Sequence, residues 1–273
     1  MSVCLNCAAA IHDDFCSKCG QEAKTKRAPI IDVIRDGLGD FFAFDSRIFK
    51  SFLPLILRPG RLTEMYLEGK RTQLISPVRM YIFVSFIFFF FVMPDSNDIN
   101  DKVQKIKDNP EIEQNIIEMQ ELEEDPEAKQ SIIDLRALID NPETEQKVLG
   151  MLNDSIRMLP HFLVLSIPLL AMALGIAHRR PKGFLYDHLI FSLHIHTFLF
   201  LSMMALSLIP SKSAVLIFLP LYFIYWVIAI KRCYKRSWKV TIPKTVILFI
   251  ADPIILFAMA MVPVSRAVAS SGF

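Results

Sequence analysis

The chain has 273 residues, a hydrophobic fraction of 53 % and a mean hydropathy of +0.39, which is high for a water-soluble domain of ordinary composition. Its net charge of +2 conceals charges that are segregated along the chain, and the absence of a long basic stripe gives no reason to expect a nucleic-acid partner. The composition predicts a mainly α-helical protein embedded in a lipid bilayer.

Two Cys-x-x-Cys pairs, Cys4 with Cys7 and Cys16 with Cys19, lie near the N-terminus. Residues 1–29 lack the apolar core of a signal peptide, so this segment is expected to stay on the side where it is made. A Cys-x-x-Cys turn directs two thiolates at one centre, and two such turns complete the tetrahedral sulfur site that zinc favours. Residues 1–28 are therefore predicted to form a zinc ribbon around one structural Zn²⁺, which has no open position for catalysis.

Two disulfides or a redox-active dithiol are the alternatives. A reducing cytoplasm disfavours stable disulfides, and a thioredoxin-like motif needs a βαβ pattern that this segment lacks. Gly20 follows the second pair, where a tight knuckle needs a residue that tolerates positive φ, and Ile11 and Phe15 are the expected apolar contacts. Residues 15–21 resemble the second knuckle of bacterial zinc ribbons.

Residues 29–76 are predicted to form an amphipathic, interfacial helical segment. Apolar residues between positions 30 and 42 follow helical spacing, and the apolar run 48–57 is too short to cross a bilayer. We expect a helix in the membrane interface whose basic side chains face lipid headgroups: Arg47, Lys50, Arg58 and Arg61. A soluble helical hairpin that caps the membrane domain is the equal alternative.

This segment contains an Arg58-Pro59-Gly60 turn and a second short element from Tyr66 to Arg71. Gly69-Lys70 is not part of a phosphate-binding P-loop, because the glycine five positions earlier and the Ser or Thr after the lysine are both missing. With the cysteine pairs and the apolar helix that follows, these elements resemble a family of uncharacterised bacterial multipass membrane proteins, a domain of unknown function. The resemblance covers most of residues 1–93 and implies a bacterial inner-membrane location without any activity.

Five transmembrane helices are predicted. The first spans residues 77–93. The other four lie within residues 158–273 and span 159–177, 189–209, 213–230 and 245–264. Basic residues concentrate in segments 1–79, 178–182 and 231–244, whereas residues 95–156 hold 17 acidic and six basic residues. The positive-inside rule then places the N-terminus in the cytoplasm and the acidic insert and C-terminus outside.

The insert, residues 94–157, is expected to form three short amphipathic helices that start near Pro110, Pro126 and Pro142. Its negative charge either attracts cations or basic partners or is simply a solvated face.

Four ionisable side chains in the apolar segments form a candidate intramembrane polar site: Asp252, His196, His194 and His188. Asp252 and His196 are each about 10 Å from the cytoplasmic ends of their helices, so they are able to meet. His194 and His196 are about 200° apart on their helix and point to different faces. A relay from Asp252 through His196 and His188 to Asp187 is one interpretation, and helix packing around a Pro253 kink is the other.

No catalytic residue is predicted, because the sequence shows no nucleophile–base pair, no open metal site and no nucleotide motif. The leading interpretation is a non-enzymatic scaffold, sensor or partner-docking protein that meets a cytoplasmic protein through its zinc ribbon. The alternative is a small transporter that uses Asp252 and His194 or His196, and a membrane-embedded enzyme ranks third. Cys233 lies in a basic cluster that suits anionic lipid at the inner leaflet.

Overall fold

The computed structural model describes residues 2–23, 47–93, 141–178, 185–209 and 212–271, with Gln130 and scattered positions between 100 and 118. The predicted helices over 30–42 and near Pro126 lie outside the described residues. The protein is mainly helical and divides into two units, Met1–Val92 with Leu163–Ile255, and Met93–Phe162 with Leu256–Phe273.

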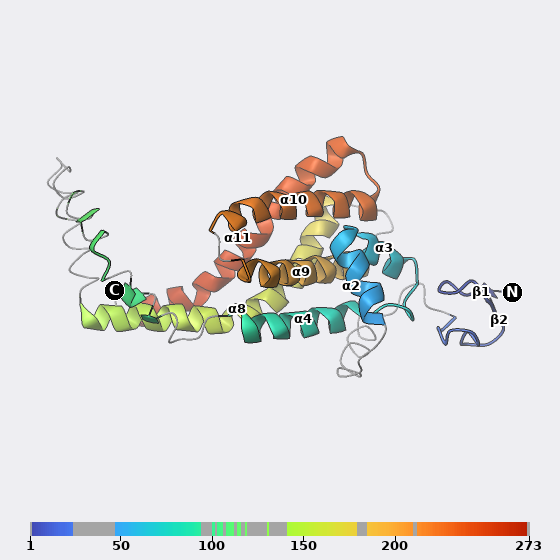
Figure 1. Cartoon of the computed structure of the whole chain (residues 1–273), viewed down its shortest axis with the longest axis horizontal. Coiled ribbons are helices and arrows are strands. Elements are labelled where there is room, and N and C mark those ends of the chain that lie inside the picture. Colours follow the sequence, from blue (N-terminus) through green and yellow to red (C-terminus); the bar gives the residue numbers. More distant parts are fainter. Residues whose placement is uncertain are drawn as a thin grey trace. The chain divides into compact units, whose positions relative to one another are not determined.

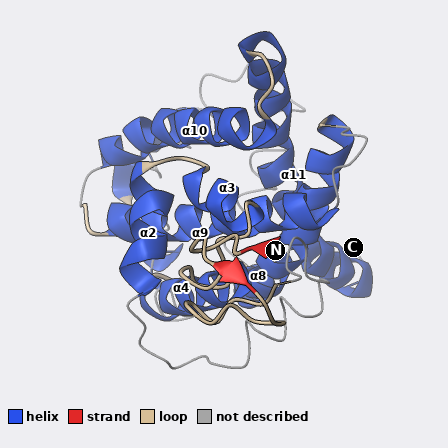
Figure 2. Cartoon of the chain, turned by 90° about the vertical axis from the view of Figure 1, so that its right-hand side faces the viewer, coloured by secondary structure: helices blue, strands red, loops and turns tan. Residues whose placement is uncertain are grey.

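The N-terminal module begins with two short antiparallel strands, β1 (Ser2–Val3) and β2 (Ala10–Ile11), which Figure 2 shows in red. An isolated bridge joins Phe15 to Glu22. Cys4, Cys16 and Ile11 form the small buried cluster of this module, so the prediction for Ile11 is confirmed. The prediction for Phe15 is wrong: its side chain is 62 % exposed, because the cysteines and Ile11 fill the cluster and leave it outside.

Two short helices, α2 (Arg47–Leu57) and α3 (Arg61–Leu67), are joined by the predicted Pro59-Gly60 turn. Gly60 has φ of 75°, a left-handed conformation that glycine adopts without strain. Both helices are amphipathic and bury one face each, with Ser51 and Leu55 on α2 and Leu62, Thr63 and Tyr66 on α3. These buried faces pack against α9 (Leu185–Ser207) and α10 (Lys212–Tyr234), so α2 and α3 cap the helical bundle.

Helix α4 (Pro77–Phe91) begins with a proline at its first turn, where the missing N–H leaves no helical hydrogen bond unmade. It runs beside α9 (Figure 1), with the rings of Phe88 and Phe200 4.9 Å apart. Its 15 residues extend about 22 Å, less than the roughly 30 Å hydrocarbon core. The predicted helix over 77–93 is confirmed as an apolar helix, but it is shorter than a helix that crosses the full hydrocarbon core.

In the part of the chain that the structure describes, four helices are long and apolar enough to cross a membrane: α8 (Pro142–Ala177), α9, α10 and α11 (Trp238–Ser271). They correspond to the four later spans predicted from the sequence. The helix that starts at Pro142, one of the predicted helix starts, continues unbroken to Ala177 through the predicted boundary at residue 158. Apolar surroundings tolerate prolines within a helix, and Pro160 and Pro168 lie inside it.

Two clusters of buried side chains form the core of the first unit. One gathers Trp226, Ile230 and Tyr234 of α10 with residues of α8, α9 and α11. The other joins Leu62 and Tyr66 of α3 to α4 and α9. Several buried polar side chains lie among them, and these include the candidate histidines.

Candidate metal centre and buried polar site

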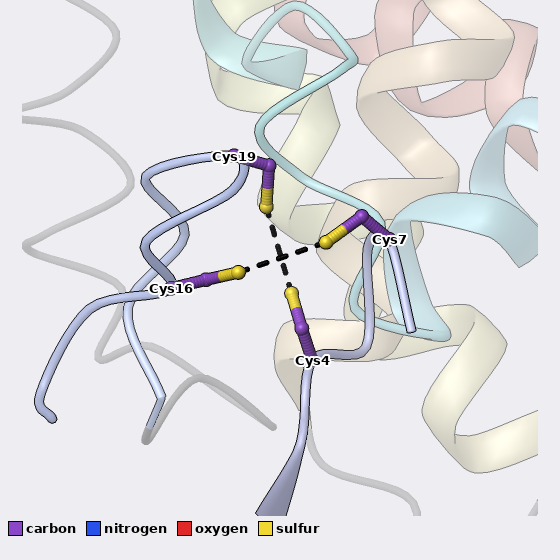
Figure 3. Close-up of side chains that lie close together, drawn as sticks. All are labelled: Cys4, Cys7, Cys16 and Cys19. Carbon is purple, nitrogen blue, oxygen red and sulfur yellow. Dashed lines mark hydrogen bonds between the residues drawn. The ribbon is translucent and has the colours of Figure 1, made fainter. Parts of the chain in front are cut away.

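The four N-terminal cysteines converge on one point (Figure 3). All four Sγ atoms lie within 4.8 Å of one another, and Cys4–Cys19 and Cys7–Cys16 are each 3.6 Å apart. Four sulfurs about 2.3 Å from a tetrahedral zinc ion are about 3.8 Å apart, whereas a disulfide needs about 2.05 Å. The cysteines are free thiols in this structure and could hold a metal ion.

The two halves of the cluster repeat one backbone pattern. In the first half, the Cys4 N–H donates to the Ala9 carbonyl and the Ala8 N–H donates to the Cys4 carbonyl. In the second half, the Cys16 N–H donates to the Gln21 carbonyl and the Gly20 N–H donates to the Cys16 carbonyl. All four hydrogen bonds are 2.8–2.9 Å long. The fifth residue of each half is left-handed, with φ of 60° at Ala8 and 71° at Gly20. The prediction for Gly20 is confirmed, and Ala8 was missed because alanine carries no turn signal.

Side chains of the cysteine module contact the turn that leads into α4. Gln21 Oε1 accepts hydrogen bonds from the N–H groups of Arg71 and Thr72 and from Thr72 Oγ1, at 3.2–3.4 Å. Leu5 lies so close to Gly69 that a Cβ atom there would be 2.7 Å from Leu5 Cδ1. The module therefore docks on residues 69–72, and sequence reasoning missed both Leu5 and Gln21.

His196 and Asp252 lie close together inside the helical bundle, which their similar depths in the helices allowed. His196 Nε2 is 3.9 Å from Asp252 Oδ2, and the two side chains are 1 % and 9 % exposed. His196 Nδ1 donates to the Ser192 carbonyl at 2.9 Å, while Nε2 lies 3.2 Å from Ser166 Oγ. The bond to Ser166 runs in either direction, depending on whether Nε2 carries a proton. Asp252 Oδ1 is buried without a hydrogen-bond partner, so this carboxylate keeps a free acceptor.

His194 and His188 have other partners. His194 Nδ1 lies 2.8 Å from Thr63 Oγ1 of α3, on a different helix face from His196, as predicted. His188 Nδ1 lies 2.7 Å from the Tyr234 hydroxyl, and the Tyr234 ring also stacks on His178 at 4.1 Å. The buried histidines of α9 thus reach different elements: His194 contacts α3, His188 contacts α10, and His196 contacts α8 and α11. Among the described residues, His196 is the histidine that lies beside Asp252.

The α2–α3 turn is tied to the end of α10 by polar contacts. Arg232 donates to the Pro59 carbonyl at 2.7 Å, and Cys233 Sγ lies 3.4 Å from the Gly60 carbonyl. Glu64 pairs with Arg61 at 2.8 Å and with Lys235 at 3.4 Å. Partial burial disfavours the charged Glu64 carboxylate, but the two cations outweigh burial and lower its pKa below the ordinary value. Arg47, expected to face lipid headgroups, donates a hydrogen bond to the Thr72 carbonyl at 3.5 Å.

The fold and the site define a helical protein with four helices able to cross a membrane and a cysteine cluster able to hold a metal ion. Residues 45–89 match the family described as "Protein of unknown function (DUF3667)". The matched segment contains α2, α3, the 69–72 turn on which the cysteine module docks, and α4 up to Phe89. No curated protein and no solved structure matches the chain.

Proposed function

We propose that the protein is a non-enzymatic membrane scaffold or sensor, in which a structural zinc ion held by Cys4, Cys7, Cys16 and Cys19 orders the segment that caps the helical bundle. The contact between Gln21 and the Arg71–Thr72 backbone carries this proposal. The Gln21 carbonyl accepts the Cys16 N–H inside the second knuckle, so one residue belongs both to the metal-binding turn and to the docking contact.

Zinc is the metal that best fits four cysteine sulfurs in a closed tetrahedral set. A four-thiolate site has no position for water, so its contribution is to folding rather than to catalysis. The buried cluster of the module contains only three side chains. A core of that size does not stabilise a domain without a metal ion or disulfides. Metal binding and folding of the module are therefore coupled.

The module also offers a surface to a protein partner. Val3 and Phe15 are 61 % and 62 % exposed, and these large apolar side chains on a small domain are available to a protein contact. The distribution of basic residues along the chain supports a cytoplasmic module and an external acidic insert in a bacterial inner membrane. A cytoplasmic protein is therefore the partner that fits.

The test compares three full-length proteins purified in detergent: wild type, Cys16→Ser with Cys19→Ser, and Gln21→Ala. We expect one zinc ion per chain in wild type and in Gln21→Ala, and none in the double cysteine variant. Hydrogen exchange of the backbone over residues 69–76 should accelerate in both variants, since each loses the docking contact. Unchanged exchange in the zinc-free double variant would show that the metal does not order this segment and would overturn the proposal.

A proton- or cation-coupled transporter is a second candidate, supported by the contact between His196 and Asp252. Ionisable groups among membrane helices are costly and mark ion pathways, and the unpartnered Asp252 Oδ1 suits a proton or cation. Wild type and three variants, Asp252→Asn, His196→Ala and His194→Ala, would be reconstituted in vesicles that contain a pH-sensitive dye. Transport predicts flux in wild type and His194→Ala and its loss in the other two, whereas equal flux in all four would exclude this site.

A further inference from the structure

Helix α2 exposes a stripe of large apolar side chains. Phe49, Leu53 and Leu57 are 81 %, 62 % and 67 % exposed, and their spacing of four residues aligns them along one helix face. The opposite face of α2, with Ser51 and Leu55, is buried against the bundle. An apolar stripe of this kind next to membrane-spanning helices is satisfied by lipid.

A cavity of about 440 Å³ lies beside this stripe. It is bounded by α2, the following Arg58, α3 and the segment Gln73–Leu74. Three basic side chains line it, Lys50, Arg58 and Arg61, and none of its described lining residues is acidic. The volume falls in the range of about 300–1,000 Å³ that holds small ligands.

Two of the three cations remain available for a ligand. Arg61 is paired with Glu64 at 2.8 Å. Lys50 and Arg58 have no ion-pair partner among the described residues, and both lie on the exposed side of the cavity. Gln73 adds an uncharged amide to the same wall. The cavity therefore presents positive charge without a compensating carboxylate.

We propose that this cavity binds one anionic phospholipid, with the headgroup phosphate between Lys50 and Arg58 and the acyl chains over Phe49, Leu53 and Leu57. Basic pockets at the ends of membrane helices attract anionic headgroups, and a lipid alone among anionic ligands also covers the adjoining apolar stripe. The site rests on α2 and α3 and is independent of the metal at the cysteine module and of the His196–Asp252 pair.

The test uses the full-length protein in a zwitterionic detergent, titrated with phosphatidylglycerol or phosphatidylcholine and followed by calorimetry and native mass spectrometry. Lys50→Gln with Arg58→Gln removes the two free charges. Lys18→Gln with Lys105→Gln is the matched control, since it removes two exposed basic side chains that lie outside the cavity and outside the basic segment after α10. We expect one bound phosphatidylglycerol per wild-type chain. The cavity variant should bind about thirtyfold more weakly, which corresponds to about 1 kcal/mol for each basic side chain, and the control should bind as wild type.

Equal weakening in both double variants would overturn the proposal, since it indicates diffuse attraction by net charge. Competition by inorganic phosphate at the affinity of the lipid would also overturn it, because the cavity would then be a site for a free anion. Phe49→Ala keeps all charges and should weaken phosphatidylglycerol binding too; unchanged lipid binding in this variant would contradict the placement of the acyl chains. Thermal unfolding without anionic lipid should be the same in all variants, because the changed side chains are exposed.

Discussion

Gly60 lies directly against the backbone of Ala229: a Cβ atom on Gly60 would be 2.8 Å from the Ala229 carbonyl oxygen and 2.9 Å from its Cα. The turn between α2 and α3 therefore approaches α10 backbone to backbone. Only a residue without a side chain allows this approach, and the φ of 75° at Gly60 requires glycine for a second reason.

Gly60→Ala is predicted to destabilise the first unit by about 2–5 kcal/mol. A left-handed conformation costs alanine about 1–2 kcal/mol, and overpacking against a backbone that cannot rotate away adds about 1–3 kcal/mol. Chemical unfolding of the detergent-purified protein measures the difference. Gly150→Ala in α8 is the control, because its Cβ would meet nothing within 4 Å and alanine favours a helix. Equal stability of the two variants would contradict the close approach.

Ala8→Gly is predicted to increase the zinc affinity of the cysteine module. Ala8 holds φ of 60°, and relief of about 1–2 kcal/mol of strain exceeds the roughly 0.5–1 kcal/mol of chain entropy that glycine loses on folding. Because metal binding and folding are coupled, a gain of about 0.5–1 kcal/mol corresponds to about two- to fivefold in affinity. Competition with a chelator measures it. Ala10→Gly, in strand β2, should weaken affinity instead, and an increase in both variants would refute the strain argument.

Glu64→Gln is predicted to flatten the dependence of stability on pH under acidic conditions. The folded-state pKa of Glu64 is lowered by Arg61 and Lys235 against the opposing effect of burial, so its ion pairs stabilise the fold fully above the ordinary value of 4.5. That contribution is lost as pH falls from there through the lowered folded-state pKa. The melting temperatures of wild type and variant should become equal at pH values below the lowered folded-state pKa of Glu64. The control is Glu68→Gln, which removes an exposed contact to Lys70 and should keep the same dependence of stability on pH as wild type. If both substitutions changed this dependence equally, the role of Glu64 would be contradicted.

Thr63→Val is predicted to destabilise the protein by about 1–3 kcal/mol, because it leaves the buried His194 Nδ1 without its 2.8 Å partner. Valine conserves the shape of threonine, so the loss reports the hydrogen bond. In a double-mutant cycle, Thr63→Val should cost much less in a His194→Leu background. Additive effects would mean that the two side chains are not coupled.

The cysteine turns and the long helices could be predicted because each follows from a pattern of residues that are close together in the sequence. The two cysteine pairs lie within fifteen residues of one another, and their turns aim the thiolates without help from the rest of the chain. Long apolar runs predicted α8, α9, α10 and α11 for the same reason, since a helix satisfies its own backbone in an apolar medium. The bounds of α4 were predicted to within two residues. The continuity of α8 across residue 158 was not predicted, because the composition changes there from polar to apolar while the helix continues.

The candidate site residues were also predicted well where local geometry was sufficient and poorly where packing decided. The similar depths of Asp252 and His196 allowed a contact between them, and their distance in the structure agrees with that geometry. Phe15 was assigned to the core from hydrophobicity alone and is exposed, since a cluster of three side chains was already filled.

The sequence by itself determined the cysteine cluster and the long apolar helices, because both follow from spacing over a few turns of chain. Only the tertiary structure decided that Gln21 meets Thr72, 51 positions away, and that Thr63 meets His194, 131 positions away. The same holds for Gly60 at Ala229 and for the basic cavity beside α2. Such contacts depend on how helix faces pack together, and no local pattern of residues records which distant face a side chain will meet.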